Sequence, residues 1–341
     1  MIEETTHRVV AGDARDLDLP ADSVDLAVTS PPYPMIEMWD DTFRALDDAV
    51  GEALDRGDGP GAFAAMHAVL DTVWDELVRV LAPGGVACVN VGDATRTVEA
   101  FRRYPNAARV TRALTDRGLS ALPDVLWRKP TNSAAKFMGS GMVPPNAYVT
   151  LEHEYVLVFR NGDGRRPASE RRRESAYFWE ERNNWFSDLW ELQGERQAME
   201  GARERTAAYP FEVPYRLVNM YSVQGDTVLD PFLGTGTTTL AAMASARDSV
   251  GYERDPGLVE AFDATAASAL AAERTAERVA GHRETVRERD DLGYESTVYG
   301  FPVMTSQEVD IRLPSLDAVT EADTADGDRH FVADHGTFRP D

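Results

Sequence analysis

Two short segments far apart in the chain carry side chains that could do chemistry. The first is Ser30-Pro31-Pro32-Tyr33, directly after an apolar run that is typical of a strand. Proline fixes φ and has no N–H, so the Ser30 hydroxyl and the carbonyl between the two prolines are acceptors held in a stiff loop. Such acceptors suit the two hydrogens of an exocyclic amino group, and Tyr33 offers a flat face on which an extruded base can stack. An ordinary Pro-Pro turn with a packed tyrosine is the alternative for this segment alone.

The second segment is a glycine-rich loop between an expected strand and an expected helix. Val228-Leu229-Asp230 is followed by Gly234-Thr235-Gly236-Thr237-Thr238. Glycines let the backbone approach a ligand, and a helix N-terminus offers unpaired N–H groups to an anionic group. Glu253, at the end of the next expected strand, is placed to accept hydrogen bonds from ribose hydroxyls. The segment therefore predicts a site for an adenosine cofactor.

Other classes of loop fit this second segment less well. No lysine follows the glycines, which disfavours the phosphate-binding loop of an NTPase. An NAD-linked oxidoreductase shares the strand-loop-helix pattern, but Asp230-Pro231-Phe232 fits it poorly and its usual Gly-x-Gly-x-x-Gly run is absent. A glycine and threonine turn without a ligand is the remaining alternative.

Apolar spacing places both loops in an alternating pattern of strands and helices. The expected strands are residues 8–13, 23–29, 86–91, 124–128, 154–159, 227–229 and 249–253. The expected helices are residues 42–81, about 101–117, 213–221, 237–246 and a final one ending at about 290. Residues 298–304 and 309–313 suggest a short hairpin, and the acidic tail after them is expected to be mobile. The alternation predicts an α/β fold with a mostly parallel sheet.

The composition is that of an acidic protein whose basic residues are almost all arginine. The 341 residues carry a net charge of −23 and suffice for one catalytic domain with an inserted or appended module. Lys129 and Lys136 are the only lysines, so 35 − 2 = 33 of the basic residues are arginine. This pattern resembles proteins of salt-accumulating halophiles, where about 1 M salt shortens the Debye length to roughly 3 Å and screens repulsion from DNA. An acidic protein that avoids polyanions is the alternative.

The single cysteine and the absence of long apolar runs limit the remaining classes. Cys88 alone excludes an internal disulfide framework and a cysteine-rich metal site, and no metal is expected. We expect Cys88 to be a small core residue. No run approaches the roughly 18 apolar residues of a membrane span, and the N-terminus does not resemble a secretory signal. The sequence thus predicts a soluble, cytoplasmic protein without a membrane partner.

Residues 160–208 are polar, aromatic and arginine-rich, without clear periodicity, and are predicted to form an inserted recognition module. Residues 160–173 contain six arginines and two acidic residues, which gives a local net charge of 6 − 2 = +4. A solvated loop is the ordinary alternative to phosphate contact. The candidates for contacts to phosphate or guanine are Arg165, Arg166, Arg171, Arg172, Arg173 and, in the loop 131–148, Lys136. The nearby aromatic residues are expected to pack rather than touch bases; they are Tyr177, Phe178, Trp179 and Trp185.

Taken together, these segments resemble the S-adenosylmethionine-dependent DNA amino-methyltransferases of the permuted beta group. That family has a [D/N/S]-P-P-[Y/F/W] motif upstream of an Asp-Pro-Phe-x-Gly-Ser-Gly-Thr-Thr loop, and Thr235 stands here in the place of the serine. The resemblance covers about residues 8–260. The other matching segments are Gly12-Asp13, residues 81–85, Trp127-Arg128-Lys129-Pro130, His153-Glu154-Tyr155, residues 187–190 and Tyr209-Pro210-Phe211.

The resemblance implies a Rossmann-like class I methyltransferase sheet, mostly parallel with one antiparallel strand, and a circularly permuted motif order. It divides the chain into a first part of the catalytic domain (1–159), a recognition module (160–208), a second catalytic part (209–292) and a C-terminal hairpin with its tail (293–341). It also implies S-adenosyl-L-methionine as the cofactor and double-stranded DNA as the partner. A companion restriction endonuclease is a further partner that the resemblance allows, and the oligomeric state stays open.

By the same resemblance, the loop Ser30, Pro31, Pro32, Tyr33 is catalytic. Its serine and the Pro31 carbonyl would hold the target amino group, and its tyrosine would stack on the flipped base. Glu253 would bind the cofactor ribose and Asp13 its adenine. The methionine part would be bound by Asp230, Pro231, Phe232, Gly234, Thr235, Gly236, Thr237 and Thr238. Transfer would be direct, without a covalent enzyme intermediate, since Cys88 does not follow a proline.

Serine at the first motif position resembles the cytosine-N4 enzymes, while aspartate is usual for adenine-N6. The resemblance therefore favours N4 of cytosine, with N6 of adenine as the alternative. Methylation of RNA or of protein glutamine is disfavoured by the arginine-rich module and the motif order. A DNA-binding protein with a decayed site is disfavoured by the intact motifs.

Overall fold

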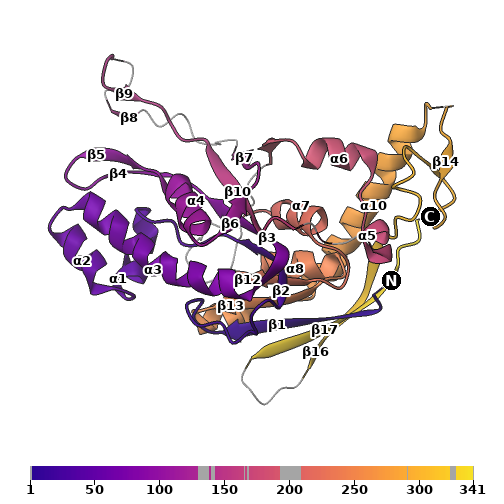
Figure 1. Ribbon diagram of the computed structural model, residues 1–341, viewed down its shortest axis with the longest axis horizontal. Coiled ribbons are helices and arrows are strands. Elements are labelled where there is room, and N and C mark those ends of the chain that lie inside the picture. The colour runs from indigo at the N-terminus through magenta and orange to yellow at the C-terminus, as the bar shows by residue number, and fades with distance from the viewer. Residues whose placement is uncertain are drawn as a thin grey trace.

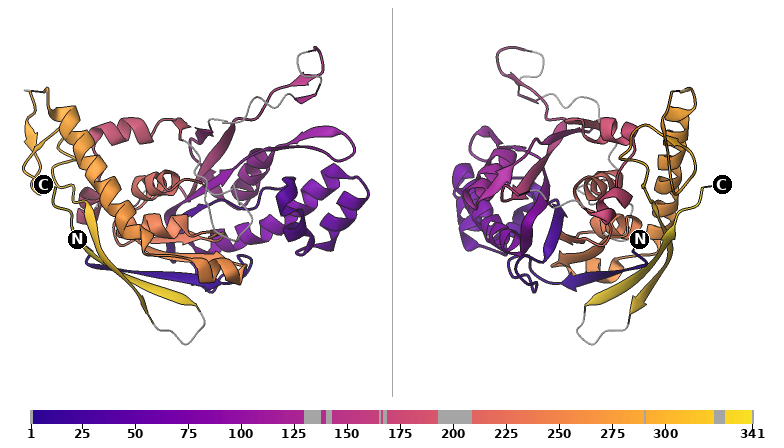
Figure 2. Two further views of the ribbon diagram at one scale, coloured as in Figure 1. Left: turned by 180° about the vertical axis from the view of Figure 1, so that it is seen from behind. Right: turned by 45° about the vertical axis from the view of Figure 1, so that its right-hand side comes forward.

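The computed structural model describes residues 2–129, 138–139, 143–164, 166, 169–192, 209–289, 291–322 and 328–340. Most of them build one large sheet with helices on both faces (Figures 1 and 2). The amino and carboxyl ends of the chain lie near each other on one side of the molecule (Figure 1). The strands that carry the two candidate loops lie in the middle of this sheet.

The main sheet has eleven strands. Across the sheet they are β11 (Leu189–Glu191), β7 (Val125–Arg128), β10 (His153–Asn161), β3 (Leu81–Val91), β2 (Val24–Thr29), β12 (Thr227–Asp230), β13 (Asp248–Glu253), β1 (Glu4–Ala11), β17 (Arg329–Thr337) and β16 (Pro314–Ala322), with β6 (Leu119–Ala121) also beside β10. β3, β2, β12, β13 and β1 are parallel to their neighbours in this run. The mostly parallel sheet is confirmed. Two strands, β10 and β17, run antiparallel to both neighbours, so the expected single antiparallel strand is one too few.

Helices lie on both faces of this sheet, and further helices lie beyond its ends (Figure 2). They are the 3-10 turn η1 (Glu37–Trp39), α1 (Asp40–Arg44), α2 (Asp48–Asp55), α3 (Gly59–Val80), α4 (Asn106–Asp116), α5 (Glu170–Glu174), α6 (Trp179–Trp185), α7 (Glu212–Tyr221), α8 (Thr237–Ala244), α9 (Pro256–Ala261) and α10 (Ala266–Val286). α1 to α4 share one apolar cluster, and α7, α8 and α10 share another with the opposite face. Asp58 caps α3 by accepting from the Gly61 N–H, with a proline at the first turn.

Alternating side chains along β2 separate these two clusters. Ala27 belongs to the cluster under α3, while Leu26 and Val28 belong to the cluster under α7 and α8. Both faces of the strand are therefore buried, as expected for a central parallel strand. Cys88, on the neighbouring strand β3, is buried as predicted, and burial raises the pKa of its thiol.

The C-terminal region differs from the expected hairpin and mobile tail. Residues 298–304 and 309–313 do not pair with each other; only a two-residue strand β15 (Pro302–Val303) forms there, paired with β14 (Tyr294–Glu295). The long hairpin lies further along the chain, in β16 and β17. β17 pairs with β1, so the segment expected to be a tail extends the main sheet.

The described part of residues 160–208 is joined to the main body. β11 pairs in parallel with β7, and the side chains of Trp185 and Trp190 are buried in the core beneath α7. Phe178 is also fully buried and Tyr177 packs partly buried against the same core as Trp185, which confirms packing for three of the four aromatic residues; Trp179 is 40% exposed. Residues 193–208 lie outside the described residues. Strand β11 of this stretch thus extends the main sheet.

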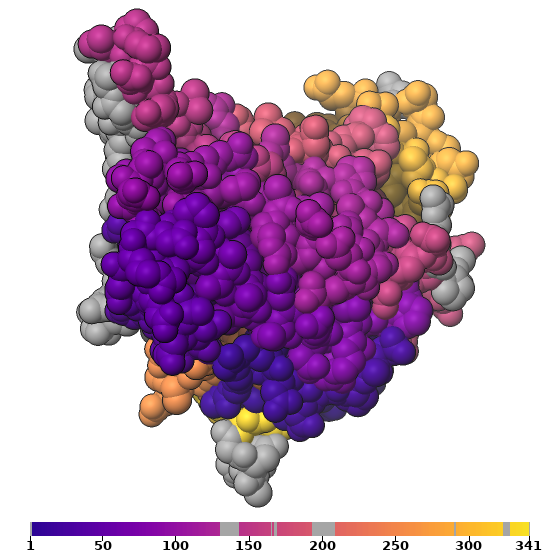
Figure 3. Space-filling model, turned by 60° about the vertical axis from the view of Figure 1, so that its left-hand side comes forward, coloured from indigo at the N-terminus to yellow at the C-terminus, as the bar shows by residue number. Residues whose placement is uncertain are grey.

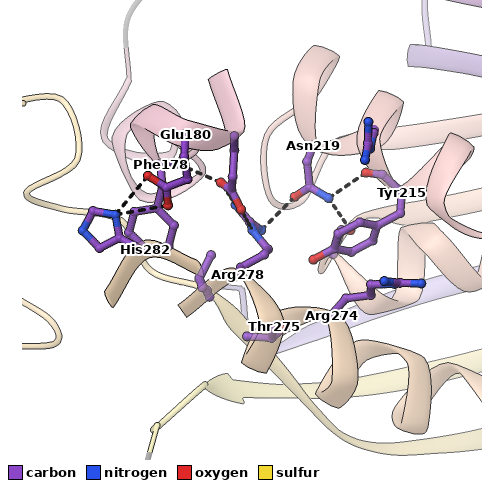
Figure 4. Close-up of polar contacts among 12 residues, drawn as sticks. Phe178, Glu180, Tyr215, Asn219, Arg274, Thr275, Arg278 and His282 are labelled. Carbon is purple, nitrogen blue, oxygen red and sulfur yellow. Dashed lines mark hydrogen bonds and ion pairs between the residues drawn. The ribbon is translucent and has the colours of Figure 1, made fainter. Parts of the chain in front are cut away.

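Polar side chains fasten α6 to α10 (Figure 4). The Arg278 guanidinium donates twice to the Glu181 carboxylate, at 2.6 and 3.0 Å, and both side chains are over 90% buried. His282 stacks on Phe178 with ring centroids 4.2 Å apart, and its Nδ1 lies 3.2 Å from the Glu180 carboxylate. This buried ion pair and stacked ring fix α6 in one position on α10.

Two small hairpins extend from the sheet. β4 (Ala94–Thr97) pairs with β5 (Phe101–Tyr104), so residues 101–104 are a strand and not the start of the helix expected over 101–117. β8 (Met138–Gly139) pairs with β9 (Ala147–Tyr148) and projects from the body (Figures 1 and 3). Phe101 and Tyr148 stack with centroids 4.6 Å apart, which joins the two hairpins.

Candidate active site

The two candidate loops follow neighbouring parallel strands. β2 pairs with β12, with Leu26 opposite Val228 and Ala27 opposite Leu229. Both strands therefore end at the same edge of the sheet, and the loops after them meet although they are distant in sequence. The chain continues from β2 to β3 on one side and from β12 to β13 on the other. Ligands of open α/β sheets bind at such a reversal of strand order.

Asp230 joins the two loops from beneath. Its carboxylate accepts hydrogen bonds from the Thr29 hydroxyl (2.7 Å), the Thr238 hydroxyl (2.7 Å) and the Phe232 N–H (3.0 Å). Tyr209 donates to it from the preceding segment at 3.3 Å. The side chain is 2% exposed, and burial raises its pKa. The structure thus places Asp230 where it fixes the loop backbone.

The glycine loop has the left-handed backbone that glycine favours. Gly234 has φ +56°, and its N–H donates to Glu253 Oε2 at 2.9 Å. Gly236 has φ +85° and is the N-cap of α8, which begins at Thr237. The predicted strand, loop and helix start are all present, and Glu253 lies at the end of β13 as expected.

A cavity of about 390 Å³ lies where these loops meet. The sequence-predicted residues that line it are Asp13, Ser30, Pro32, Pro231, Phe232, Gly234, Thr235, Thr237 and Glu253. Further walls come from η1, α1 and α3 and from the segments around β1 and β13; among them are Arg15, Trp39, Phe43, Leu46, Leu70, Tyr252, Arg254 and Leu258. One cavity therefore joins the catalytic loop to the glycine loop.

Asp13 enters the cavity between two arginines. Arg15 donates to both of its carboxylate oxygens, at 3.0 and 2.8 Å, and Arg254 lies 3.3 Å away. Burial alone would raise the pKa of Asp13, but the hydrogen bonds and charge of Arg15 outweigh it and lower the pKa. Asp13 is thus held as a carboxylate, which can accept hydrogen bonds from a ligand.

The catalytic loop is tied to strands β3 and β10. Tyr33 donates from its hydroxyl to Glu154 Oε2 at 3.0 Å and lies 3.1 Å from Ser30 Oγ. Asn90 donates from Nδ2 to both Tyr33 (2.8 Å) and Glu154 (2.7 Å). Burial, reinforced by the charge of Glu154, raises the pKa of Tyr33 well above its ordinary value, so its phenol stays protonated. Lys129 forms an ion pair with the other Glu154 oxygen.

Comparisons with known proteins identify the family of this chain. A family model for DNA methylases matches residues 24–264, which include both loops. The chain belongs to this family. It is 49% identical over 322 residues to the type II methyltransferase M.MthZI of Methanothermobacter thermautotrophicus, covering 91% of this chain and 90% of that protein. It is 46% identical over 269 residues to the type II methyltransferase M.MjaI of Methanocaldococcus jannaschii, covering 74% and 89%.

The fold also matches a solved structure. TTHA0409 of Thermus thermophilus, solved in complex with S-adenosyl-L-methionine, is 30% identical with a TM-score of 0.59. The match covers 81% of this chain and 95% of that one. A DNA methylase requires access to a base beside a methyl donor. Among the helices that the structure describes, none combines the length and apolar character of a membrane span.

Of the candidate DNA-binding arginines, the structure brings none of those that it describes to this cavity. Arg166 is paired with Asp226 (2.8 Å) and Asp25 (3.4 Å), at the starts of β12 and β2. The amino ends of these two strands lie on the opposite side of the sheet from their carboxyl ends, which carry the two loops. Arg171, Arg172 and Arg173 lie on α5, and the last is 3.9 Å from Asp310. Lys136 and Arg165 lie outside the described residues. DNA contact by these residues stays a prediction.

Sequence reasoning missed several residues of the site. Asn90 is a buried polar residue within an apolar strand, and this break in the pattern was the available signal. Lys129 and Glu154 stood in matching family segments without an assigned role, and the structure joins them to Tyr33. Trp39 lines the cavity from η1, and nothing in its local sequence marks it.

Proposed function

We propose that this DNA methylase transfers a methyl group from S-adenosyl-L-methionine to the exocyclic N4 of cytosine in duplex DNA. The observation that carries the proposal is the single cavity in which Ser30 lies beside the glycine loop 234–237 and Glu253. A hydroxyl acceptor for an amino group and acceptors for an adenosine thus line one cavity. Family membership supports methyl transfer to DNA.

The residues of the cavity fit the cofactor. Glu253 accepts the N–H groups of Gly234 and Asp255 with its two oxygens, and each oxygen keeps a lone pair for a ribose hydroxyl. Asp13 supplies a carboxylate for the adenine amino group. Apolar side chains for the adenine ring come from Leu46, Leu70, Pro231 and Leu258. The methionine part would lie along the backbone at the start of α8, where N–H groups suit a carboxylate.

Orientation would supply most of the catalysis. When bound, S-adenosyl-L-methionine supplies an electrophilic methyl group. Ser30 Oγ and the Pro31 carbonyl would accept hydrogen bonds from the two N–H groups of the target amino group. Held in this way, its nitrogen lone pair would point towards the cofactor side of the cavity. Tyr33 would stack on the flipped base, and Pro32 keeps the loop rigid. Holding two reactants in line in this way can lower a barrier by about 7–11 kcal/mol.

Serine at position 30 supports cytosine as the target base, with N6 of adenine as the alternative. The Ser30 hydroxyl can accept a hydrogen bond from the amino group of cytosine or of adenine, and the methylated base is identified by experiment. Unmethylated plasmid DNA should be incubated with the protein and S-adenosyl-L-methionine over a range of KCl concentrations, digested to nucleosides and analysed by mass spectrometry. We expect N4-methylcytosine from the wild type, and about 100-fold less from Ser30→Ala. N6-methyladenine without N4-methylcytosine would overturn the base assignment.

Double-stranded DNA is the proposed partner, and a companion endonuclease is compatible with relatives named as type II methyltransferases. RNA offered in the same assay provides the class control, since the proposal expects methylation of duplex DNA alone. Methyl incorporation into RNA and not into DNA would contradict the proposed substrate.

A further inference from the structure

A chain of hydrogen bonds leads from the Ser30 hydroxyl away from the cavity. Ser30 Oγ lies 3.1 Å from the Tyr33 hydroxyl, and Tyr33 donates to Glu154 Oε2 at 3.0 Å. Lys129 pairs with the other oxygen of the same carboxylate. The Glu154 side chain is 15% exposed and that of Lys129 is 30% exposed. The chain of hydrogen bonds thus runs from the cavity wall, through the partly buried Tyr33 phenol, to an ion pair that reaches solvent.

The rules for donors and acceptors fix the direction of the protons in this chain. An ionised carboxylate only accepts, so the single Tyr33 proton is directed to Glu154. The Tyr33 oxygen can then only accept from Ser30, and the Ser30 proton is directed to Tyr33. Asn90 Nδ2 also donates weakly to Ser30 Oγ at 3.5 Å, so one lone pair of this oxygen remains for the N–H of a target amino group. The arrangement therefore makes Ser30 an acceptor towards the cavity.

Asn90 and Gly92 keep this chain in place. Asn90 is 2% exposed and donates at 2.8 Å to Tyr33 and at 2.7 Å to Glu154, so it holds phenol and carboxylate together. The carboxamide must present its NH2 group here because the carboxylate cannot donate. A Cβ at Gly92 would lie 3.2 Å from both the Tyr33 ring and the Glu154 side chain. Both side chains therefore pack against bare backbone.

We propose that Ser30, Tyr33 and Glu154 form a proton relay that takes up the proton lost by the methylated amino nitrogen. The relay rests on the proposed function, direct transfer to an exocyclic amino group. As the nitrogen lone pair forms the new N–CH3 bond, the electrons of the C–S bond leave with sulfur and the nitrogen becomes cationic. Its proton passes to Ser30 Oγ, the Ser30 proton to Tyr33 and the Tyr33 proton to Glu154 Oε2. The N–H electron pair returns to nitrogen, and Glu154 becomes a neutral carboxylic acid.

A serine needs such a relay because its hydroxyl is not a base. An aspartate at position 30 could take the proton itself, whereas the hydroxyl can only pass it on. Lys129 forms an ion pair with Glu154 and is partly exposed, so the relay ends close to the protein surface.

Two substitutions of nearly equal size interrupt the relay without leaving a cavity in place of the side chain. Tyr33→Phe keeps the ring for stacking, and Glu154→Gln keeps the size of the side chain. Each should lower the single-turnover methylation rate about 100-fold or more, the lower range for general acid-base catalysis. The KM for DNA and the affinity for S-adenosyl-L-methionine should stay unchanged. The control is Glu152→Gln, which removes a carboxylate that lies next to β10 and 3.7 Å from Arg128. Equal rates for Glu154→Gln and the control would overturn the relay.

A double-variant cycle separates proton transfer from a structural role of Glu154. Ser30→Asp places a carboxylate beside the amino nitrogen and bypasses the relay. In that background, Glu154→Gln should cost less than about threefold, because the proton no longer travels to Glu154. A structural role would give the same loss in both backgrounds, and this result would contradict the proposal.

A spectroscopic readout tests the relay independently of methylation. With 13Cζ-labelled tyrosine, Glu154→Gln should shift the Tyr33 resonance at neutral pH and lower the pKa of its phenol, because the acceptor loses its charge. An unchanged Tyr33 resonance would refute the contact whether or not the protein methylates DNA. A shifted resonance in a wild type that methylates no DNA would instead point to failure of the proposed function alone. The labelled protein thus distinguishes the two failures.

Discussion

Gly236 is required by its own backbone and by a neighbouring side chain. Its φ of +85° is in the left-handed region, and an added Cβ would lie 2.3 Å from the Phe262 ring. Gly236→Ala should therefore lower the free energy of unfolding by about 3 kcal/mol, from backbone strain and overpacking together. Urea unfolding would measure it. The control is Gly281→Ala in α10, where an added Cβ meets nothing within 4 Å and should raise stability by about 0.5–1 kcal/mol. Equal effects would contradict this account.

At the same scale, a motif identifies residues but not the direction in which each side chain points. The residues of both loops were predicted from sequence, and most of them line one cavity. Asp230 was expected to bind the cofactor, yet its hydrogen bonds run to Thr29 and Thr238 beneath the loop. Asn90 could not be assigned from sequence, because its role depends on Tyr33 and Glu154 meeting it from two other segments. Such contacts arise only when strands pair.

At the scale of elements, a buried chain of polar side chains holds the C-terminal hairpin to β1. Thr5 on β1 lies 2.8 Å from His335 on β17 and 2.9 Å from His7, which in turn contacts Ser249 on β13 at 2.8 Å. Burial, with a smaller contribution from the charge of His335, lowers the pKa of His7 from 6.5 to about 3. Burial also lowers the pKa of His335. Both imidazoles are therefore neutral where the hairpin is docked.

This histidine pair predicts loss of stability in acid. The unfolded chain binds a proton at His7 below pH 6.5, whereas the folded chain does so only near pH 3. The free energy of unfolding therefore keeps its full value above pH 6.5 as far as His7 is concerned. As pH falls from 6.5 to about 3 it decreases, by at most about 1.4 kcal/mol per pH unit. His7→Gln should flatten this slope in urea unfolding between pH 7 and 5. His330→Gln, a partly exposed neighbour on β17, is the control and should keep it.

The buried ion pair between α6 and α10 gives a second test at this scale. Arg278→Met would leave the Glu181 carboxylate buried without its charged partner and should cost about 3–5 kcal/mol. Replacing both residues, as Arg278→Met with Glu181→Leu, should recover most of that loss, because no charge is then left buried. Urea unfolding of both variants measures the difference. If the double variant were less stable than the single one, the pair itself would be the source of stability.

The elements also show where periodicity fails as a predictor. The central strands were found because both of their faces are apolar. β16 was missed because it is an edge strand whose residues are mostly half-buried or exposed, so its sequence lacks an apolar alternation. β11 was missed for a similar reason: of its three residues only Trp190 is buried. Short edge strands are determined by pairing with a sheet that already exists, and this information is not local.

At the scale of the whole molecule, the charge of −23 opposes folding and DNA binding alike. Raising KCl from 0.1 to 1 M shortens the Debye length from about 10 to about 3 Å, which screens repulsion among surface carboxylates more than it weakens buried pairs. The melting temperature should therefore rise with KCl, with most of the gain at low concentrations where the Debye length changes most. NaCl should act equally, since screening depends on ionic strength, and sucrose is the uncharged control. A melting temperature that is constant or falls over this range would show that self-repulsion does not limit stability.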